Sequence, residues 1–407
     1  MSSRMPPFPL LRTKKTIAVA LILLLCILAG FGIVYICCKK SPVSPYHYSV
    51  PQRTNDGWET ASLATENIDA VLIGEMFERI NDQSYKNIHG VLLVKNGKLV
   101  VEEYFPGRDS NGKEREFHRD MRHEMHSVAK SVNSILVGIA IDQRLIRGVD
   151  ERVSDLLPEY ADVFADHKRD DLRLKHLLTM SSGLSWDEWT HPYSDPRNDL
   201  AAMDRSRDII KYVLERPVIA PPGEKFAYSG GISLVLGEIV HQCSKLPTEE
   251  FAKRFLFEPL GISNYRWWEW RSGILNTGGG LVMRPRDMAK IGHLFLNGGR
   301  WQGKQIVSER WVAESSRNYV DARQFPKWHE DDGYGYQWWL RSFPVNGQMI
   351  PSFHAAGMGG QFIFVFPSLQ TVAVFTGWAD NELGKQPFDM LQRYILPALV
   401  RASAVRH

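Results

Sequence analysis

The chain has 407 residues, which is long enough for one large domain or two with an ample apolar core. Its 49 basic and 46 acidic side chains nearly balance, and this balance argues against a nucleic-acid-binding protein. Of the four cysteines, Cys243 alone lies outside the first apolar segment, so the rest of the chain cannot form an internal disulfide. The histidines and cysteines show no ligand spacing, and we expect no metal and no other cofactor.

The N-terminal segment is the first predicted element. Residues 16–38 are 23 consecutive positions without a charged side chain, enough to cross a bilayer as a helix. A cleavable signal peptide has a shorter apolar core and a cleavage site of small residues, so we predict an uncleaved transmembrane signal anchor. Basic residues in residues 1–15 predict a cytoplasmic tail, a single pass, and a main domain on the periplasmic or extracellular side. Residues 39–57 contain three prolines and predict an extended linker.

Further elements follow in chain order. The apolar spacing of residues 68–80 predicts a helix, and residues 91–95 and 98–105 predict a β-hairpin with a type I′ turn at Asn96-Gly97. Helical patterns dominate the middle of the chain, at 172–178, 206–214, 231–241, 248–257 and 285–296. Strand patterns return at 334–340, 361–366 and 371–376, before a closing helix at 388–396.

This order of elements predicts an α+β fold. Strands near both ends of the chain predict one antiparallel sheet built from the N- and C-terminal parts, with flanking helices. The helical patterns between them predict an inserted, mainly helical lobe at about 149–297.

Another helix is predicted from Val128, because apolar residues recur at Val132, Ile135, Leu136 and Ile139. Ser127 lies in its first turn, and Lys130 lies one turn later on the same face. A serine hydroxyl is a poor nucleophile until a base removes its proton. A lysine can act as that base where burial lowers its pKa from about 10.4 toward neutrality. Ser127 and Lys130 are therefore candidates for a nucleophile and its base.

Ser-x-x-Lys is a short pattern, and the chain contains it twice. The other copy, Ser110 to Lys113, includes Asn-Gly, which is typical of a turn, so we interpret it as a solvated loop. The alternative for Ser127 is an ordinary helix-capping serine. His126 is an alternative base, but neighbouring residues on a helix point about 100° apart, so Lys130 is preferred.

Two later stretches supply groups that an acyl-transfer site needs. Residues 222–231 place Tyr228 in a loop after Pro-Gly and before a helix. A tyrosine there can act as a second base or pass a proton to the leaving group. Residues 354–360 are rich in alanine and glycine and directly precede a predicted strand. Small residues let a substrate lie against the strand edge, where a backbone N–H can act as an oxyanion donor.

In this order the motifs resemble those of the class C beta-lactamase-like serine hydrolases. That group includes class C beta-lactamases, D-Ala-D-Ala carboxypeptidases, carboxylesterases and aminohexanoate-dimer hydrolases. Other stretches that resemble the family are 176–184, 257–262, 278–281, 286–289 and 296–299. The resemblance runs from about residue 56 to residue 399 and implies a beta-lactamase/transpeptidase-like hydrolase domain at 58–402. Residues 56–58 and 359–361 resemble the aminohexanoate-dimer hydrolase branch.

The resemblance implies roles for particular residues. Ser127 would be the nucleophile, Lys130 its base partner, and Tyr228 the tyrosine of the family's Tyr-x-Asn motif. The backbone N–H groups of Ser127 and Gly357 would form the oxyanion hole. Substrate contacts fall on position 230 and on the third family motif, that is, on Gly230, His354, Ala355 and Ala356.

This sequence departs from the family pattern at two places. Gly230 stands where the family has an asparagine, so a side-chain amide that would hold the substrate's acyl amide is missing. Ala355 and Ala356 replace a threonine and a glycine, so the hydroxyl that helps to grip a substrate carboxylate is missing. Both departures put efficient beta-lactam hydrolysis and strict D-Ala-D-Ala recognition in doubt. The tryptophans are expected mainly in packing, with Trp338 or Trp339 as the candidate wall of an acyl pocket.

We therefore expect a membrane-anchored serine hydrolase that forms an acyl-enzyme with a small ester or amide, as a carboxylesterase or an aminohexanoate-dimer-hydrolase-like enzyme does. One alternative is a penicillin-binding D-Ala-D-Ala peptidase or a weak class C-type beta-lactamase. A second alternative, kept open by Gly230 and Ala356, is a catalytically silent anchored protein that binds a ligand or acts as a scaffold. The expected partners are a small ester, amide or peptide substrate and, through the N-terminal helix, a membrane.

Overall fold

The computed structural model describes residues 46–165, 167–322, 333–379 and 385–401. The predicted cytoplasmic tail, the predicted transmembrane anchor and residues 39–45 of the predicted linker lie outside these ranges. Within the described ranges, no helix combines the length and the apolar character that crossing a bilayer requires.

Residues 46–57, the described part of the predicted linker, have no helix or strand and lie against the folded domain. The Tyr46 hydroxyl donates a hydrogen bond to the Glu103 carboxylate at 2.6 Å. Arg286 donates from one nitrogen to Asp56 at 3.0 Å and from another to the Gln52 carbonyl oxygen at 2.7 Å. These contacts make the segment part of the folded unit.

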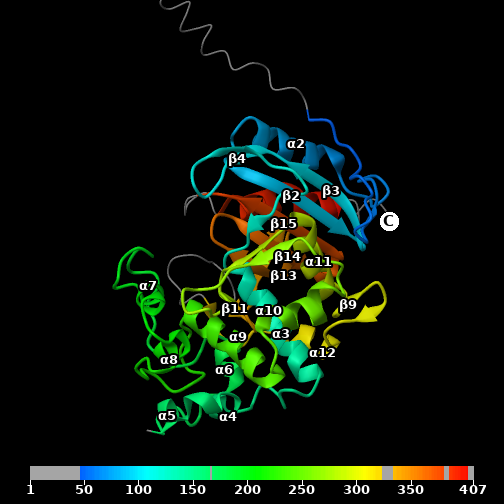
Figure 1. The fold of residues 1–407 in the computed structure, drawn as a ribbon. Coiled ribbons are helices and arrows are strands. Elements are labelled where there is room, and N and C mark those ends of the chain that lie inside the picture. The colour runs from blue at the N-terminus through cyan, green and yellow to red at the C-terminus, as the bar shows by residue number, and fades with distance from the viewer. Residues whose placement is uncertain (1–45, 166, 323–332, 380–384, 402–407) are drawn as a thin grey trace, which may run out of the picture. The chain divides into compact units, whose positions relative to one another are not determined.

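The centre of the fold is a sheet with eight strands among the described residues (Figure 1). In sheet order these are β1 (Glu59–Thr60), β3 (Lys98–Tyr104), β2 (Ile88–Lys95), β15 (Thr371–Gly377), β14 (Gln361–Phe366), β13 (Gln348–Gly357), β12 (Trp339–Val345) and β11 (Gly333–Tyr334). The N- and C-terminal parts meet where β2 pairs with β15, with Val94 opposite Val372. This pairing confirms the predicted sheet built from both ends of the chain. The strand pairs described are antiparallel except for β1 and β3, which run parallel.

The β2–β3 hairpin turns at Asn96 and Gly97, as predicted. Their φ angles are 50° and 80°, and two positive values in succession are what a type I′ turn requires. β2, β14 and β15 are buried along nearly their whole length. Strands buried on both faces need a layer of helices on each side of the sheet.

One face of the sheet is covered by α2 and by the C-terminal helical segment. These elements are α2 (Ala70–Asn81), α13 (Gln386–Met390), η6 (Leu391–Ile395) and α14 (Leu396–Arg401). Their apolar side chains pack with those of Leu93, Phe364 and Phe375. The predicted helices at 68–80 and 388–396 therefore form this layer together.

The opposite face is covered by α11 (Pro285–Leu296) and α3 (Val128–Asp142). Successive side chains of a strand point to opposite faces of the sheet. Those that point to the α3 and α11 face include Ile363 and Val372. A Cβ at Gly292 of α11 would lie 2.6 Å from a methyl carbon of each of these two residues. Glycine at this position thus lets α11 lie close against the sheet.

The inserted lobe contains the predicted helices. They are α6 (Leu174–Leu178), α8 (Ile209–Leu214), α9 (Gly230–Ser244) and α10 (Thr248–Ala252), the last continuing into a π-helical turn, η2 (Lys253–Phe257). Short helices that the sequence analysis did not predict are α4 (Val153–Leu156), η1 (Pro158–Tyr160), α5 (Ala161–Phe164) and α7 (Asp199–Asp204). α9 packs along α3, and Asn133 of α3 donates a hydrogen bond to the Ser233 carbonyl oxygen of α9 at 2.9 Å.

Smaller elements complete the described structure. A three-stranded sheet joins β6 (His123–Glu124), β8 (Leu281–Met283) and β7 (Tyr265–Trp267). Two hairpins pair β4 (Pro106–Arg108) with β5 (Glu114–Glu116), and β9 (Arg300–Trp301) with β10 (Lys304–Gln305). The remaining elements are α12 (Glu309–Ser315) and η4 (Pro367–Leu369).

Two predictions near the C-terminus were wrong in detail. The predicted strand at 334–340 is two strands, because a turn with Gln337 at a φ of 64° separates β11 from β12. Residues 354–357 belong to β13, whereas the sequence analysis placed them ahead of a strand. Alanine and glycine have low strand propensity, but the pairing of Ala355, Ala356 and Gly357 with β14 overrides it.

Candidate active site

Ser127 and Lys130 lie together at the start of α3. Ser127 directly precedes the helix, and its hydroxyl makes no capping hydrogen bond to the helix backbone. Lys130 Nζ donates a hydrogen bond to Ser127 Oγ at 3.0 Å. One helical turn therefore brings the two predicted residues within hydrogen-bonding distance, and the geometry does not support a plain capping role for Ser127.

The environment of Lys130 makes its neutral form more accessible than that of an ordinary lysine. Its side chain is 4% exposed, and Nζ also donates to the Gly278 carbonyl oxygen at 2.6 Å. Burial lowers the pKa of Lys130 to about 8, against the opposing effect of the negative charge on Glu188. An amine with this pKa is partly neutral at neutral pH, and the neutral amine can accept a proton from a serine hydroxyl.

Tyr228 reaches the same place from the loop before α9. Its phenol forms a side-chain hydrogen bond with Ser127, and its ring centre lies 5.0 Å from Lys130 Nζ. Trp339 stacks on the Tyr228 ring with 5.7 Å between centroids and so fixes the plane of the ring. Burial raises the pKa of Tyr228, and the charge on Glu188 raises it further. The phenol therefore stays protonated at neutral pH and is able to donate a proton.

Gly357, the last residue of β13, lies against the segment that leads into Ser127. A Cβ at Gly357 would be 2.3 Å from the Met125 carbonyl oxygen, so a glycine is needed for this close approach. His126, between Met125 and Ser127, has a φ of 45°, in the left-handed region that few residues other than glycine adopt. The two predicted oxyanion donors, the backbone N–H groups of Ser127 and Gly357, thus belong to neighbouring segments.

A cavity of about 250 Å³ is lined by Ser127 and Lys130; we call it the catalytic cavity. Gly230, a predicted substrate contact, also lines it. The rest of the wall is largely aromatic and amide in character and includes His126, Tyr193, Trp268, Trp270, Asn276 and Met358. A cavity of this size and lining can take a small, partly apolar molecule next to the serine hydroxyl.

Glu188 also lines the catalytic cavity, and the sequence analysis did not single it out. This carboxylate is 3% exposed, and its Oε2 accepts hydrogen bonds from the Gly230 backbone N–H and from Trp186 Nε1, both at 2.8 Å. A Cβ at Gly230 would lie 3.0 Å from the same oxygen and 2.9 Å from Leu200 Cδ1. Glu188 and Leu200 therefore occupy the space that a side chain at position 230 would need, which accounts for the glycine there.

The structure does not bring the third-motif side chains into the cavity. His354 is fully buried, and its ring lies 4.8 Å from Phe364 and 5.6 Å from Phe388 on the sheet face opposite α3. Ala355 is fully buried in the core on the α3 side. The prediction that these side chains contact substrate is corrected, because neighbouring strand residues point to opposite faces and only the end of β13 approaches Ser127. Ala356 does not line the cavity either.

The two candidate tryptophans are also placed differently. Trp338 is fully buried and stacks on Phe295 with 4.4 Å between centroids, so it is a core residue and not a pocket wall. Trp339 contacts Tyr228 instead of the cavity. The walls come from Trp268 and Trp270, which the sequence analysis assigned to packing. Trp268, Trp270 and Glu188 lie in irregular loops, and these loops come close to Ser127 only in the folded lobe. Their positions in the sequence therefore show no spacing pattern that could have revealed them.

Within the described residues, no group of three or more His, Cys, Asp or Glu side chains is arranged to hold a metal ion.

Known proteins share the sequence pattern and the fold. The sequence model of the Beta-lactamase family matches residues 68–383. The 6-aminohexanoate-dimer hydrolase of Paenarthrobacter ureafaciens is 26% identical over 307 residues, which are 71% of this chain and 73% of that protein. A penicillin-binding protein homolog from Caulobacter crescentus superposes with a TM-score of 0.63 at 16% identity, covering 82% of this chain and 96% of that one. A family VIII carboxylesterase gives a TM-score of 0.61 at 16% identity, covering 81% and 96%. The predicted beta-lactamase/transpeptidase-like fold is confirmed.

Proposed function

Because the chain belongs to the Beta-lactamase family, we propose that it is a serine hydrolase that works through an acyl-enzyme on Ser127. The observation that carries the proposal is the 3.0 Å hydrogen bond between Lys130 Nζ and Ser127 Oγ at the wall of a cavity. Burying an amine costs folding free energy. A buried amine with a lowered pKa beside a hydroxyl therefore fits a catalytic role better than a stabilising one.

In the acylation step, neutral Lys130 removes the proton of Ser127 Oγ, and the oxygen attacks the substrate carbonyl carbon. The backbone N–H groups of Ser127 and Gly357 stabilise the oxyanion, at roughly 3 kcal/mol for each donor. As the bond to the leaving group breaks, the Tyr228 phenol gives its proton to that group. Lys130 then restores the phenol proton, so the step balances with Ser127 acylated and both bases in their starting forms.

In the deacylation step, a water molecule attacks the acyl carbon of the ester on Ser127. Its proton passes through Tyr228 and Lys130 and finally to Ser127 Oγ as the acid product leaves. The raised pKa of Tyr228 supports a relay role for the phenol and argues against a resting tyrosinate base. Lys130 is then the group whose protonation state controls the rate.

We propose a small ester or amide as the substrate. The cavity of about 250 Å³ with aromatic walls has room for a short acyl group. The similarity to an aminohexanoate-dimer hydrolase supports amide cleavage as one such activity. The threonine hydroxyl of the family's third motif is absent at Ala355, which makes a D-Ala-D-Ala peptidase the weaker assignment.

The membrane anchor at residues 16–38 stays a proposal and rests on the uncharged 23-residue segment. In cells that express the full chain, we expect the protein to remain in the membrane pellet after alkaline carbonate washing. A variant that lacks residues 1–45 should be released. Recovery of the full chain in the wash would contradict the anchor.

The first testable prediction concerns the nucleophile. Ser127→Ala should lower kcat/KM for p-nitrophenyl esters by about a thousandfold or more, because no other group in the cavity can form the acyl-enzyme. The matched control is Ser368→Ala, which changes an exposed serine in η4 and should leave the rate unchanged. Hydrolysis at the parental rate by the Ser127→Ala protein would remove the basis of the proposal.

The same proteins separate the enzyme from a silent scaffold. A fluorophosphonate probe should label the parent and the Ser368→Ala protein, and mass spectrometry should place the label on Ser127. A parent protein that neither takes up the probe nor hydrolyses any ester would favour the catalytically silent alternative.

A further inference from the structure

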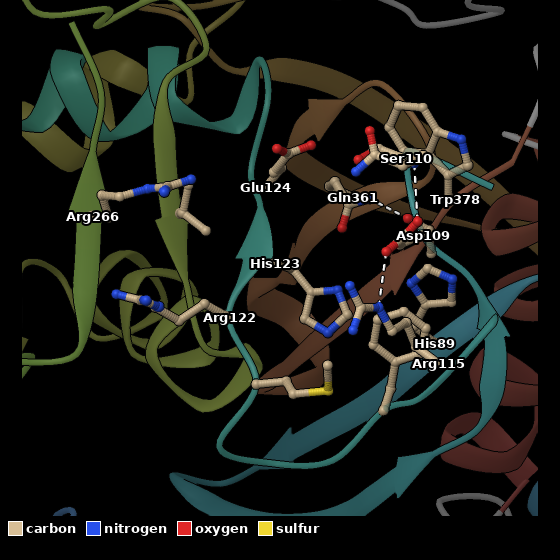
Figure 2. A pocket seen from close by; sticks show the side chains of 15 residues that line it. His89, Asp109, Ser110, Arg115, Arg122, His123, Glu124, Arg266, Gln361 and Trp378 are labelled. Atoms are coloured by element: carbon tan, nitrogen blue, oxygen red, sulfur yellow. Dashed lines mark hydrogen bonds and ion pairs between the residues drawn. The ribbon is translucent and has the colours of Figure 1, made fainter. Parts of the chain in front are cut away.

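A second cavity, of about 400 Å³, is lined partly by residues just before α3 (Figure 2). We call it the arginine cavity, because its lining includes Arg115, Arg122 and Arg266. The bend that leads into α3 separates the two: Glu124 lines the arginine cavity, and His126 lines the catalytic cavity. Trp378 lines the arginine cavity as well, and its ring centre lies 5.5 Å from that of His126. The two cavities therefore share a wall.

One of the three arginines is already neutralised. Arg115 Nε donates to Asp109 Oδ2 at 2.9 Å, as Figure 2 shows. The other oxygen of Asp109 accepts hydrogen bonds from the backbone N–H groups of Asn111 and Lys113, both at 3.0 Å. Asp109 and Arg115 thus hold the turn between β4 and β5 in shape and leave no net charge.

Arg122 and Arg266 are in a different situation. Both side chains are exposed and form no ion pair with another described residue, and Arg122 makes a long hydrogen bond of 3.4 Å to the Tyr265 carbonyl oxygen. The remaining acid of the lining, Glu124, lies 3.7 Å from His126 Nε2. Burial lowers the pKa of His126. Two arginines therefore face one carboxylate, and the cavity keeps a net positive charge.

The inner wall of the arginine cavity adds an unsatisfied polar group. His89 stacks on Phe117 with 3.7 Å between ring centres, and Phe117 lies 5.0 Å from the ring of His123. His123 is 6% exposed, and its Nε2 has no hydrogen-bond partner among the described residues. Burial lowers the pKa of His123 to about 3, so its ring is neutral and can present one N–H. A buried polar nitrogen is costly unless something pairs with it.

We propose that the arginine cavity binds a carboxylate group of the substrate whose scissile carbonyl lies at Ser127. The proposal rests on the serine hydrolase function proposed above. A guanidinium presents two parallel N–H donors that match the two oxygens of a carboxylate. Arg122 and Arg266 supply such donors at the cavity, whereas the ring of His123, the residue after Arg122, points to the other side of β6 (Figure 2).

The spacing of the two cavities defines the substrate class. Glu124 and Ser127 are three residues apart, so their Cα atoms are separated by at most about 11 Å. An acid group that lies several bonds from the scissile carbonyl can span this distance. We place this carboxylate on the acyl part of the ester or amide.

Paired substrates test this proposal. Mono-p-nitrophenyl suberate carries a carboxylate at the end of its acyl chain, and p-nitrophenyl octanoate is the neutral ester of matching length. We expect the parent enzyme to prefer the suberate ester. Arg122→Gln and Arg266→Gln should each lower kcat/KM for this ester about tenfold or more, which is the loss of one charged hydrogen bond. The octanoate rate should change less than twofold.

The control for charge is Arg254→Gln, since Arg254 is exposed on η2 and lines neither cavity. This variant should hydrolyse both esters like the parent. Thermal unfolding checks that each arginine variant is folded. No preference for the suberate ester in the parent, or an equal loss on both esters in the variants, would overturn the proposal.

A binding measurement keeps this proposal separate from the proposed function. In the Ser127→Ala background, calorimetric titration with suberate should give binding that Arg122→Gln and Arg266→Gln weaken about tenfold or more. Equal affinity in all three proteins, or no binding to any, overturns the carboxylate site even where the parent hydrolyses neutral esters. Arginine-dependent binding in a protein that hydrolyses nothing would support the site and contradict the hydrolase.

Discussion

Lys130 and Glu188 influence each other's charge at the catalytic cavity. Burial lowers the pKa of Lys130 and raises that of Glu188, while the attraction between the two charged forms acts against both effects. Two hydrogen bonds of 2.8 Å, from the Gly230 N–H and the Trp186 indole, stabilise the Glu188 carboxylate. We interpret Glu188 as a positioning residue that sets the pH range in which Lys130 is neutral.

The pH dependence of the rate follows from this arrangement. The proposed mechanism needs neutral Lys130, so kcat/KM should rise with pH and level off above the Lys130 pKa of about 8. Glu188→Gln removes a negative charge that favours the ammonium form, so the rising limb should move to lower pH. A pH–rate profile with a neutral p-nitrophenyl ester measures this shift.

An exposed acid serves as the control for that profile. Glu309→Gln changes a charge at the start of α12 and should leave the rising limb in place. A limb that stays fixed or moves to higher pH in the Glu188→Gln protein would contradict the coupling between Glu188 and Lys130.

At the residue scale, the sequence predicted the residues whose positions depend on local spacing. Ser127 and Lys130 are one helical turn apart, and Tyr228 follows a recognisable Pro-Gly loop, so local sequence was enough to single them out as candidates, and the fold places them close together. His354 was placed wrongly, because the face to which a strand residue points depends on the strand's pairing and not on its neighbours in sequence. Glu188 was missed, since a single acidic residue in a loop has no pattern until the fold closes around it.

At the scale of elements, the end of β13 and the bend before α3 are in direct contact. Gly357 approaches the Met125 carbonyl oxygen so closely that a Cβ would be 2.3 Å away. This contact ties a central strand of the sheet to the turn that carries the proposed nucleophile. The strand thereby fixes the backbone of the proposed oxyanion hole.

Gly357→Ala should therefore push the two elements apart. We expect a loss of about 1–3 kcal/mol in the free energy of unfolding, as for overpacked sites, together with a fall in kcat for neutral esters. Gly148→Ala is the matched change, because a Cβ at Gly148 would meet nothing within 4 Å. Denaturant unfolding and ester kinetics on both proteins measure the effects. Equal behaviour of the two variants would show that the contact does not matter.

Regular elements with strong patterns were predicted well, and irregular ones were not. α11 begins and ends at the predicted residues, because its apolar stripe and its initial Pro285 are both visible in the sequence. The short helices α4, α5 and α7 were missed, although α6 and α8, which are also no longer than six residues, were predicted. The parallel pairing of β1 with β3 involves only two residues of each strand, and no sequence pattern predicts so short a pairing.

At the scale of the whole molecule, the layer formed by α2 and the C-terminal helical segment lies on the sheet face opposite α3. The proposed nucleophile and its base lie at the start of α3, on the other side of the sheet. Leu391 of this layer is fully buried. Leu391→Ala should lower the free energy of unfolding by about 2–5 kcal/mol through the cavity it leaves. At temperatures well below unfolding, kcat/KM should stay at the parental value, since no proposed site residue touches this layer.

Gln392→Ala provides the comparison, because Gln392 is exposed beside Leu391. Its free energy of unfolding should stay within about 0.5 kcal/mol of the parent. Thermal unfolding and ester kinetics on both variants separate stability from activity. A loss of activity in the folded Leu391→Ala protein would contradict the independence of the two sheet faces.

The pairing of β2 with β15 has a consequence for biosynthesis. β15 lies inside the sheet, between the first hairpin and β14, so the hairpin has no neighbour on that side until residues 371–377 are made. Contacts between such distant positions form slowly, and a nascent chain still on the ribosome lacks the last of them. The central sheet should therefore stay incomplete until residues 371–377 have left the ribosome, and a chain truncated before β15 should leave the first hairpin without its partner.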